Sequence, residues 1–194
     1  MAKAFKYYMF HKPKGVLSQF TKEHGKKALC DLISVPNDVY PIGRLDEDSE
    51  GLLLLSNNKN VNALLLDPAN KHWRTYFVQV AGQITNKALK ELENGMDIAV
   101  KGTVHSTLPA KAKKTKQPVY ISYQEVSEKS TTWIKLSLQE GKYHQVRKMT
   151  AKVGFPTLRL IRTHVEDLEL GALKEGELKQ IDKVMFAKRL YLEL

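Results

Sequence analysis

The sequence predicts an α+β fold with a largely antiparallel sheet. Stretches with strand character are grouped along the chain, helical stretches are interspersed among them, and several neighbours are joined by short turns. The chain has 194 residues, of which 42% are hydrophobic. It is therefore long enough to bury a core, as one domain or as two closely packed halves.

Strands are predicted where β-branched, aromatic or alternating apolar residues run between turn signals. The clearest signal is the alternation of Ile134, Leu136 and Leu138, which places these side chains on one face. The four leucines at 52–55 are too short a run to cross a membrane and are bounded by turn residues, so they indicate a buried strand. The predicted strands cover residues 7–10, 16–20, 52–55, 76–80, 119–126, 133–139 and 158–165.

Helices are predicted where apolar residues recur at helical spacing, at residues 25–33, 61–65, 85–94 and 144–153. Thr85 provides a cap for the third of these. In the fourth, cations follow one another at intervals of four residues on a face separate from the apolar stripe. Residues 111–118 contain four lysines and almost no apolar side chains, so a mobile loop is expected there. Residues 183–194 fit either a docked terminal helix or a loose tail.

The charge balance favours a polyanionic partner, with nucleic acid as the leading candidate. Lys and Arg number 31 against 21 acids, giving a formal net charge of +10. A generic basic protein of the cytosol fits the same balance. The single cysteine, Cys30, excludes an internal disulfide framework and a zinc site built from thiolates. No apolar stretch has the length of a membrane span and no signal peptide is evident, so a cytoplasmic location is expected.

A cluster of carboxylates directly precedes the apolar run at 52–55. It occupies residues 43–51, and we interpret it as a catalytic loop, because a buried strand fixes the end of the loop that enters it. Asp46 lies two residues from Arg44, and a second cation could sit opposite. A nearby positive charge keeps an aspartate ionised at neutral pH, fit to act as nucleophile or base.

Two other interpretations of this loop compete. The first is a solvated loop of mixed charge, the usual explanation of an acidic cluster. The second is a calcium loop, because Asp46, Asp48, Glu50 and Gly51 occupy the first, third, fifth and sixth positions of the EF-hand template. The twelfth position is Asn57 where that template requires a bidentate glutamate, which argues against calcium.

Three ordered motifs resemble those of the RsuA family of pseudouridine synthases. They are KPKGV at residues 12–16, GRLD at 43–46 followed by SEGLL at 49–53, and GKYHQVRKM at 141–149. The stretch VGFPTLRLIR at 153–162 looks like the RluE branch, which acts on 23S ribosomal RNA. The match runs from about Lys6 to about Ile181. Lys142 departs from the arginine that many relatives carry, which matters if that position contacts phosphate, since lysine offers only a point charge.

The resemblance implies a catalytic domain over residues 1–183, followed by a C-terminal tail at 184–194. The domain would consist of two halves that share an extended, mainly antiparallel sheet, with helices at its flanks and the active site in a central cleft. The family's small N-terminal S4 domain is expected to be absent. The implied enzyme detaches uracil from its ribose at N1, rotates it and rejoins it through C5. It needs neither metal nor organic cofactor, and a monomer acting on 23S ribosomal RNA is expected.

The resemblance also implies roles for individual residues. Asp46 would be the catalytic carboxylate, by ring addition or by a glycosidic-cleavage route, and both routes require an anion. Because a stacked uracil cannot be reached, the nucleotide must be extruded. Arg44 would fill the vacated space and Tyr76 would stack on the base, although a half-buried tyrosine of a sheet is the commoner explanation for its position. The remaining implied residues are Arg147 as the partner of Asp46, Leu160 as an apolar wall, and Lys12, Lys142, His144, Lys148 and Lys152 as phosphate contacts. An alternative function is an rRNA-binding assembly factor that has lost catalysis.

Overall fold

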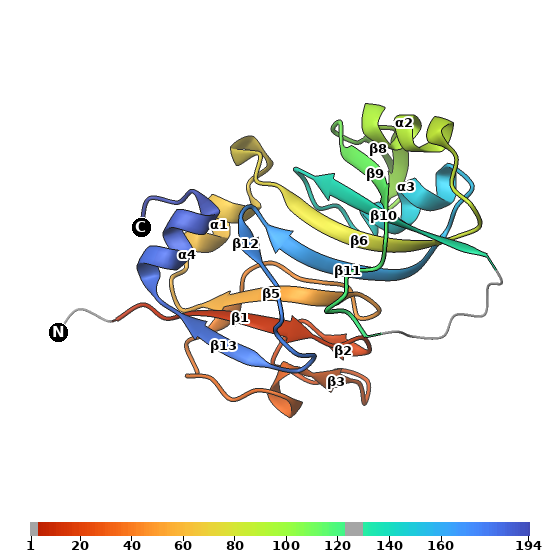
Figure 1. The fold of residues 1–194 in the computed structure, drawn as a ribbon. Coiled ribbons are helices and arrows are strands. Elements are labelled where there is room, and N and C mark those ends of the chain that lie inside the picture. The colour runs from red at the N-terminus through yellow and green to blue at the C-terminus, as the bar shows by residue number, and fades with distance from the viewer. Residues whose placement is uncertain (1–3, 123–129) are drawn as a thin grey trace. The chain divides into compact units, whose positions relative to one another are not determined.

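The computed structural model describes residues 4–122 and 130–194 (Figure 1). The chain divides into two compact units. The first combines Met1–His72 with Arg162–Leu194, and the second is Trp73–Ile161. Helices and mainly antiparallel strands occur in both, which confirms the predicted α+β class and sheet type. The predicted central cleft stays a prediction.

The first unit is built around two neighbouring buried strands. Strand β1 (Tyr7–Lys12) pairs antiparallel with β5 (Glu50–Ser56) on one side and with β13 (Leu178–Ile181) on the other. Every residue of β1 and β5 is buried. This burial explains the continuous apolar run within β5, because both faces of the strand are covered. The shorter strands of this unit are β4 (Tyr40–Pro41), paired with β5, and β12 (Leu168–Glu169), paired with the end of β11 (Thr157–Val165).

The first unit also contains α1 (Asn60–Leu66) and the C-terminal helix α4 (Lys183–Leu190). Asp182 caps α4 by accepting a hydrogen bond from the Met185 amide at 2.8 Å. Phe186 of α4 is completely buried and stacks on Tyr7, with ring centroids 4.5 Å apart. Of the two possibilities for residues 183–194, the docked helix is therefore correct, and the segment 184–194 belongs to the first unit.

The second unit is built on three antiparallel strands in the order β6 (Arg74–Ala81), β10 (Thr131–Leu138) and β9 (Lys111–Thr115). Its helices are α2 (Asn86–Asn94), capped by Thr85 as predicted, and α3 (Gln145–Lys152). A hairpin of β7 (Asp97–Val100) and β8 (Thr103–Ser106) completes the unit. Ile134 and Leu136 are fully buried, which confirms the predicted apolar face of β10. No helix within the described residues is long and apolar enough to cross a membrane.

Several local predictions were wrong or only partly right; the strand predicted at 16–20, for example, covers only β2 (Val16–Leu17). Residues 111–115, expected to be a mobile loop, form β9, because their backbone pairs with β10. The helix expected at 25–33 is replaced by β3 (Lys27–Ala28) and one 3-10 turn, Leu29–Asp31, because β3 pairs in parallel with β2 (Val16–Leu17). Residues 119–122 are not a strand, and the rest of the strand predicted at 119–126 lies outside the described residues.

Candidate active site

The loop that carries Asp46 connects β4 to β5 in the first unit. It leaves the sheet at Ile42, whose amide donates to the Leu54 carbonyl at 2.7 Å, and it re-enters the sheet at Glu50. Arg44 is exposed and Asp46 is half-buried. Both ends of the loop are therefore fixed to one buried strand, while Arg44 remains open to solvent.

Two anchors hold the backbone on either side of Asp46. On one side, the Leu45 amide donates to Ser18 Oγ at 3.0 Å, and the same hydroxyl donates to the Leu45 carbonyl at 2.8 Å. On the other side, the Glu47 carbonyl accepts from the Gly15 amide at 2.7 Å. The residues before and after Asp46 are both hydrogen-bonded to the segment 15–18. The backbone at Asp46 is therefore fixed, and its side chain projects from it in a defined direction.

Lys12 corrects one of the sequence predictions. It was expected to contact RNA phosphate, but it is completely buried. Its ammonium donates to the carbonyls of Pro13 at 2.9 Å, Val16 at 2.7 Å and Glu47 at 3.3 Å. These bonds use all three of its protons, so no donor is left for a phosphate.

The electrostatic surroundings of Lys12 come mainly from the Asp46 loop. Burial lowers the pKa of the Lys12 ammonium to about 8, and the carboxylates of the loop oppose this shift, in the order Glu50, Asp48, Asp46 and Glu47. Lys12 is therefore a cation inside the first unit that organises this acidic loop.

The glycine of the SEGLL part of the motif is explained by close packing at Gly51. The φ of Gly51 is +103°, and a Cβ at this position would lie 2.2 Å from the Arg162 carbonyl oxygen.

In the second unit, a buried amide organises the GKYHQVRKM motif. Gln145 is 3% exposed. Its Oε1 accepts from the Lys142 amide at 2.9 Å, and its Nε2 donates to Glu140 Oε1 at 2.8 Å. The same Glu140 oxygen accepts from the Leu108 amide at 2.8 Å. His144, between the turn and α3, has a left-handed backbone with φ of 53°. This network shapes the turn that precedes α3.

The cations of the motif surround the start of α3. Lys148 is half-buried, and its ammonium lies 5.0 Å from the centroid of the exposed Tyr143 ring. That ring also stacks on His144 at 4.0 Å. Lys152 is exposed and donates to the Asp97 carbonyl at 2.6 Å. Arg147 lies on the same helix and is half-buried.

The two remaining predicted residues belong to strands of the second unit. Tyr76 is the third residue of β6, which confirms its expected position near a strand's beginning. It is 9% exposed and pairs across the sheet with Leu136. Leu160 lies in β11 and is 4% exposed.

The predicted residues are therefore divided between the units. The first unit brings Arg44, Asp46 and Lys12 onto neighbouring segments. The second contains Tyr76, Lys142, His144, Arg147, Lys148, Lys152 and Leu160. The pairing of Asp46 with Arg147 stays a prediction. Sequence reasoning missed the structural roles of Ser18 and of the Gln145–Glu140 pair. Of these residues, only Gln145 could have been singled out from the sequence, because it lies within a motif.

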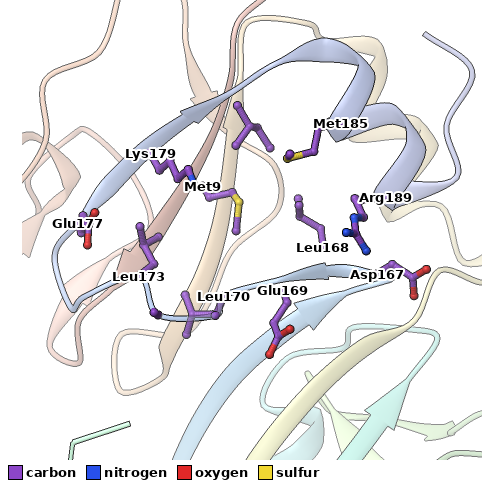
Figure 2. Close-up of a pocket in the computed structure, with 13 residues that line it drawn as sticks. Met9, Asp167, Leu168, Glu169, Leu170, Leu173, Glu177, Lys179, Met185 and Arg189 are labelled. Atoms are coloured by element: carbon purple, nitrogen blue, oxygen red, sulfur yellow. The ribbon is translucent and has the colours of Figure 1, made fainter. Parts of the chain in front are cut away.

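A hollow of about 440 Å³ lies elsewhere in the first unit, beside α4 and β12 (Figure 2). Met9, Leu168, Leu170 and Met185 give it apolar walls, and charged side chains such as Arg189 stand at its margin (Figure 2). None of the residues predicted for the active site lines it. We therefore take the Asp46 loop, and not this hollow, as the candidate site.

Comparison with known proteins agrees with the motifs. A model of the family described as RNA pseudouridylate synthase matches residues 6–152. The ribosomal large subunit pseudouridine synthase E of Vibrio parahaemolyticus is 42% identical over 180 residues, which cover 91% of this chain and 74% of that relative. The protein of the same name from Xanthomonas axonopodis is 39% identical over 171 residues, covering 85% of this chain and 88% of the relative.

A solved structure supports the same assignment. The crystal structure of a pseudouridylate synthase superimposes with a TM-score of 0.76 at 25% identity, covering 96% of this chain and 74% of that one. The matching family model alone spans well over half of the sequence. The chain therefore belongs to the RNA pseudouridylate synthase family, in the RsuA group that its three motifs indicate.

Proposed function

We propose that this protein isomerises one specific uridine of 23S ribosomal RNA to pseudouridine, with Asp46 as the catalytic carboxylate. The observation that carries the proposal is the double anchoring of the Asp46 loop, through Ser18 on one side and Gly15 on the other. A reacting group needs such fixed placement. The relatives named ribosomal large subunit pseudouridine synthase E support the choice of RNA.

The reaction is an isomerisation, so it consumes no co-reactant. The bond between N1 and the ribose C1′ breaks, the uracil rotates, and a bond forms between C5 and C1′. C5 loses a proton and N1 gains one, which leaves the composition unchanged. Asp46 acts as an anion, either as the nucleophile or as the base, and the proposal includes neither a metal nor an organic cofactor.

Roles for the surrounding residues follow from the motif resemblance. Arg44 occupies the space that the extruded nucleotide leaves in the RNA, and its exposure at the loop supports this role. Tyr76 stacks on the extruded base and Leu160 forms an apolar wall. Arg147 is the cation that pairs with Asp46, because a guanidinium orients a carboxylate through two parallel hydrogen bonds.

Phosphate contacts are assigned to the cations of the GKYHQVRKM motif and of α3, which are Lys142, His144, Lys148 and Lys152. The net charge of +10 supports binding to a polyanion. Action as a monomer in the cytoplasm is part of the same proposal, and the enzyme would meet ribosomal RNA there.

The test is pseudouridine formation in unmodified 23S ribosomal RNA by the purified protein. Asp46→Asn should abolish formation while RNA binding remains. Glu47→Gln is the matched control, because Glu47 forms a surface ion pair with Lys26 at 2.6 Å, and the substitution leaves its backbone carbonyl able to accept from the Gly15 amide and the Lys12 ammonium. We expect this control to retain activity. Full activity in Asp46→Asn would remove the assignment. Binding without modification by the wild-type protein would favour the inactive assembly factor.

A further inference from the structure

One face of the second unit's sheet carries interleaved aromatic and lysine side chains. Residues paired directly across antiparallel strands project to the same side, so the registers define this face. Lys113 of β9 pairs with Lys135 of β10, which pairs with Phe77 of β6. One row further, Trp133 lies between Thr115 and Gln79. We call the set Trp73, Phe77, Trp133, Lys111, Lys113 and Lys135 the lysine–aromatic face.

Trp73 belongs to this face although it precedes β6 by one residue. It lies two and four positions before Thr75 and Phe77, and strand geometry places such residues on one side. A side-chain contact agrees with this placement. The Lys111 ammonium lies 4.1 Å from the centroid of the Trp73 ring. Lys111 itself pairs with Ser137, which pairs with Thr75.

The two faces of this sheet differ sharply in burial. On the opposite face, Val78, Ile134 and Leu136 are fully buried in the core. On the lysine–aromatic face the three aromatic rings are only half-buried, and Lys111 and Lys113 are exposed. Between the rings lie small hydrogen-bonded side chains, such as Thr75 and Ser137, whose hydroxyl oxygens are 2.8 Å apart. The pairing of β6 with β10 holds the positions of Phe77 and Trp133, while part of each ring remains accessible.

The charge of this face has one sign. Lys135 lies 5.9 Å from the centroid of the Phe77 ring, so two of the three rings have an ammonium above them. Among the described positions that β6, β9 and β10 contribute to this face, none is Asp or Glu. Three cations on a face where none of these described strand positions is a carboxylate complement a phosphate backbone, and the rings between them complement bases.

We propose that the lysine–aromatic face binds an unpaired segment of the substrate RNA, outside the nucleotide that is modified. Bases stack on Trp73, Phe77 and Trp133, and the lysines contact the phosphates between them. Stacking of bases on aromatic side chains along a basic surface is how proteins hold single-stranded nucleic acid. The inference rests on the proposed function only in taking RNA as the ligand. The competing explanation is that lysines protect the exposed edge strand β9 from pairing with other chains.

Tryptophan fluorescence gives a direct test, because the chain contains two tryptophans and both lie on this face. The wild-type protein is titrated with a single-stranded oligouridine RNA of about twelve nucleotides, and binding is followed in parallel by anisotropy of a labelled RNA. We expect saturable quenching with the same dissociation constant as the anisotropy change. RNA binding that leaves the tryptophan emission unchanged would overturn the proposal, and so would an absence of binding at low salt.

Adjacent lysines of β9 provide a matched pair of variants. Lys113 projects from the lysine–aromatic face, whereas Lys114 pairs with the buried Ile134 and projects from the other face. Both are exposed, so Lys113→Gln and Lys114→Gln change the net charge equally. We expect Lys113→Gln to weaken binding several-fold and to reduce the slope of log affinity against log salt by about 0.7, while Lys114→Gln changes neither appreciably. Equal effects of the two variants would overturn the proposal, because the lysines would then act only by protecting the edge strand or through the net charge of the protein.

An aromatic variant tests the stacking part separately. Trp133→Leu should weaken binding of the oligouridine RNA about tenfold and leave the salt slope unchanged, because it removes a ring and no charge. An unchanged affinity would refute stacking at Trp133. These measurements do not depend on catalysis. If quenching occurs but no pseudouridine forms, the proposed function fails and this inference stands. If pseudouridine forms and the tryptophans do not respond to bound RNA, the inference fails alone.

Discussion

The side-chain ammonium of Lys12 donates a hydrogen bond to the backbone carbonyl of Glu47, 3.3 Å away and one residue beyond Asp46. The Gly15 amide bonds the same carbonyl at 2.7 Å. A buried cation and a turn amide therefore converge on the residue that follows the proposed catalytic carboxylate. The KPKGV motif, which comes about thirty residues earlier in the chain, thus acts by holding the GRLD loop.

Lys12→Met should lower the rate of pseudouridine formation about 10- to 100-fold, mainly in kcat. The variant removes the donor to Glu47, and a small displacement of a reacting group costs this much in rate. The free energy of unfolding should change little. Loss of the hydrogen bonds of Lys12 lowers it, and removal of a buried charge raises it. Lys14→Met is the control, since Lys14 lies in the same motif and is exposed. Equal kcat in the two variants would contradict a positioning role for Lys12.

The buried Lys12 should also make stability depend on pH. Burial lowers the pKa of Lys12 to about 8 from its ordinary value of 10.5. Between these values the unfolded chain binds the extra proton, so the free energy of unfolding rises with pH. The stability of the wild type relative to Lys12→Met should therefore increase by up to about 3 kcal/mol from neutral pH to about pH 10. Urea unfolding of both proteins at the two pH values measures this change. If the difference in free energy of unfolding between them is the same at both pH values, the low pKa of Lys12 is refuted.

Gly51→Ala should destabilise the protein by more than about 3 kcal/mol, because the new Cβ meets backbone and not a movable side chain. That Cβ would lie 2.2 Å from the Arg162 carbonyl oxygen, at a φ of +103°. Gly102→Ala separates the strain of a positive φ from the clash with backbone. Gly102 has a φ of +83°, but a Cβ added there would have no atom within 4 Å. The control should cost only about 1–2 kcal/mol. Similar urea midpoints for the two variants would exclude the clash.

Sequence reasoning succeeded where a local pattern coincides with the burial it implies. The leucines at 52–55 form the fully buried centre of β5, and Thr85 caps α2 as its residue type suggests. It failed at residues 111–115, which are rich in lysine and yet form a strand. An edge strand can satisfy its backbone through one neighbour while its lysines reach water, so composition does not distinguish it from a loop.

Long-range contacts account for the other failures. Residues 25–33 have helical spacing, but pairing of β3 with β2 overrides it. Lys12 was expected at the surface with the other cations of its motif. It is buried instead, and its surroundings include one carbonyl, that of Glu47, and the carboxylates of the distant loop at 46–50. No pattern within a short stretch of sequence predicts such contacts. The division of the predicted site residues between two units is likewise a property of the fold and not of their spacing in the motifs.

Gln145→Glu should destabilise the protein by about 2–4 kcal/mol at neutral pH, because it places a second carboxylate 2.8 Å from Glu140 where an amide now donates a hydrogen bond. Repulsion favours the protonated form of the introduced carboxyl in the folded state. The folded state then binds the extra proton, so the penalty is present above its folded pKa and disappears as the pH falls below about 4. Urea unfolding relative to wild type at both pH values tests this, with the exposed Gln180→Glu as control. A penalty that persists at low pH would mean that the lost amide donor, and not charge repulsion, makes Gln145 necessary.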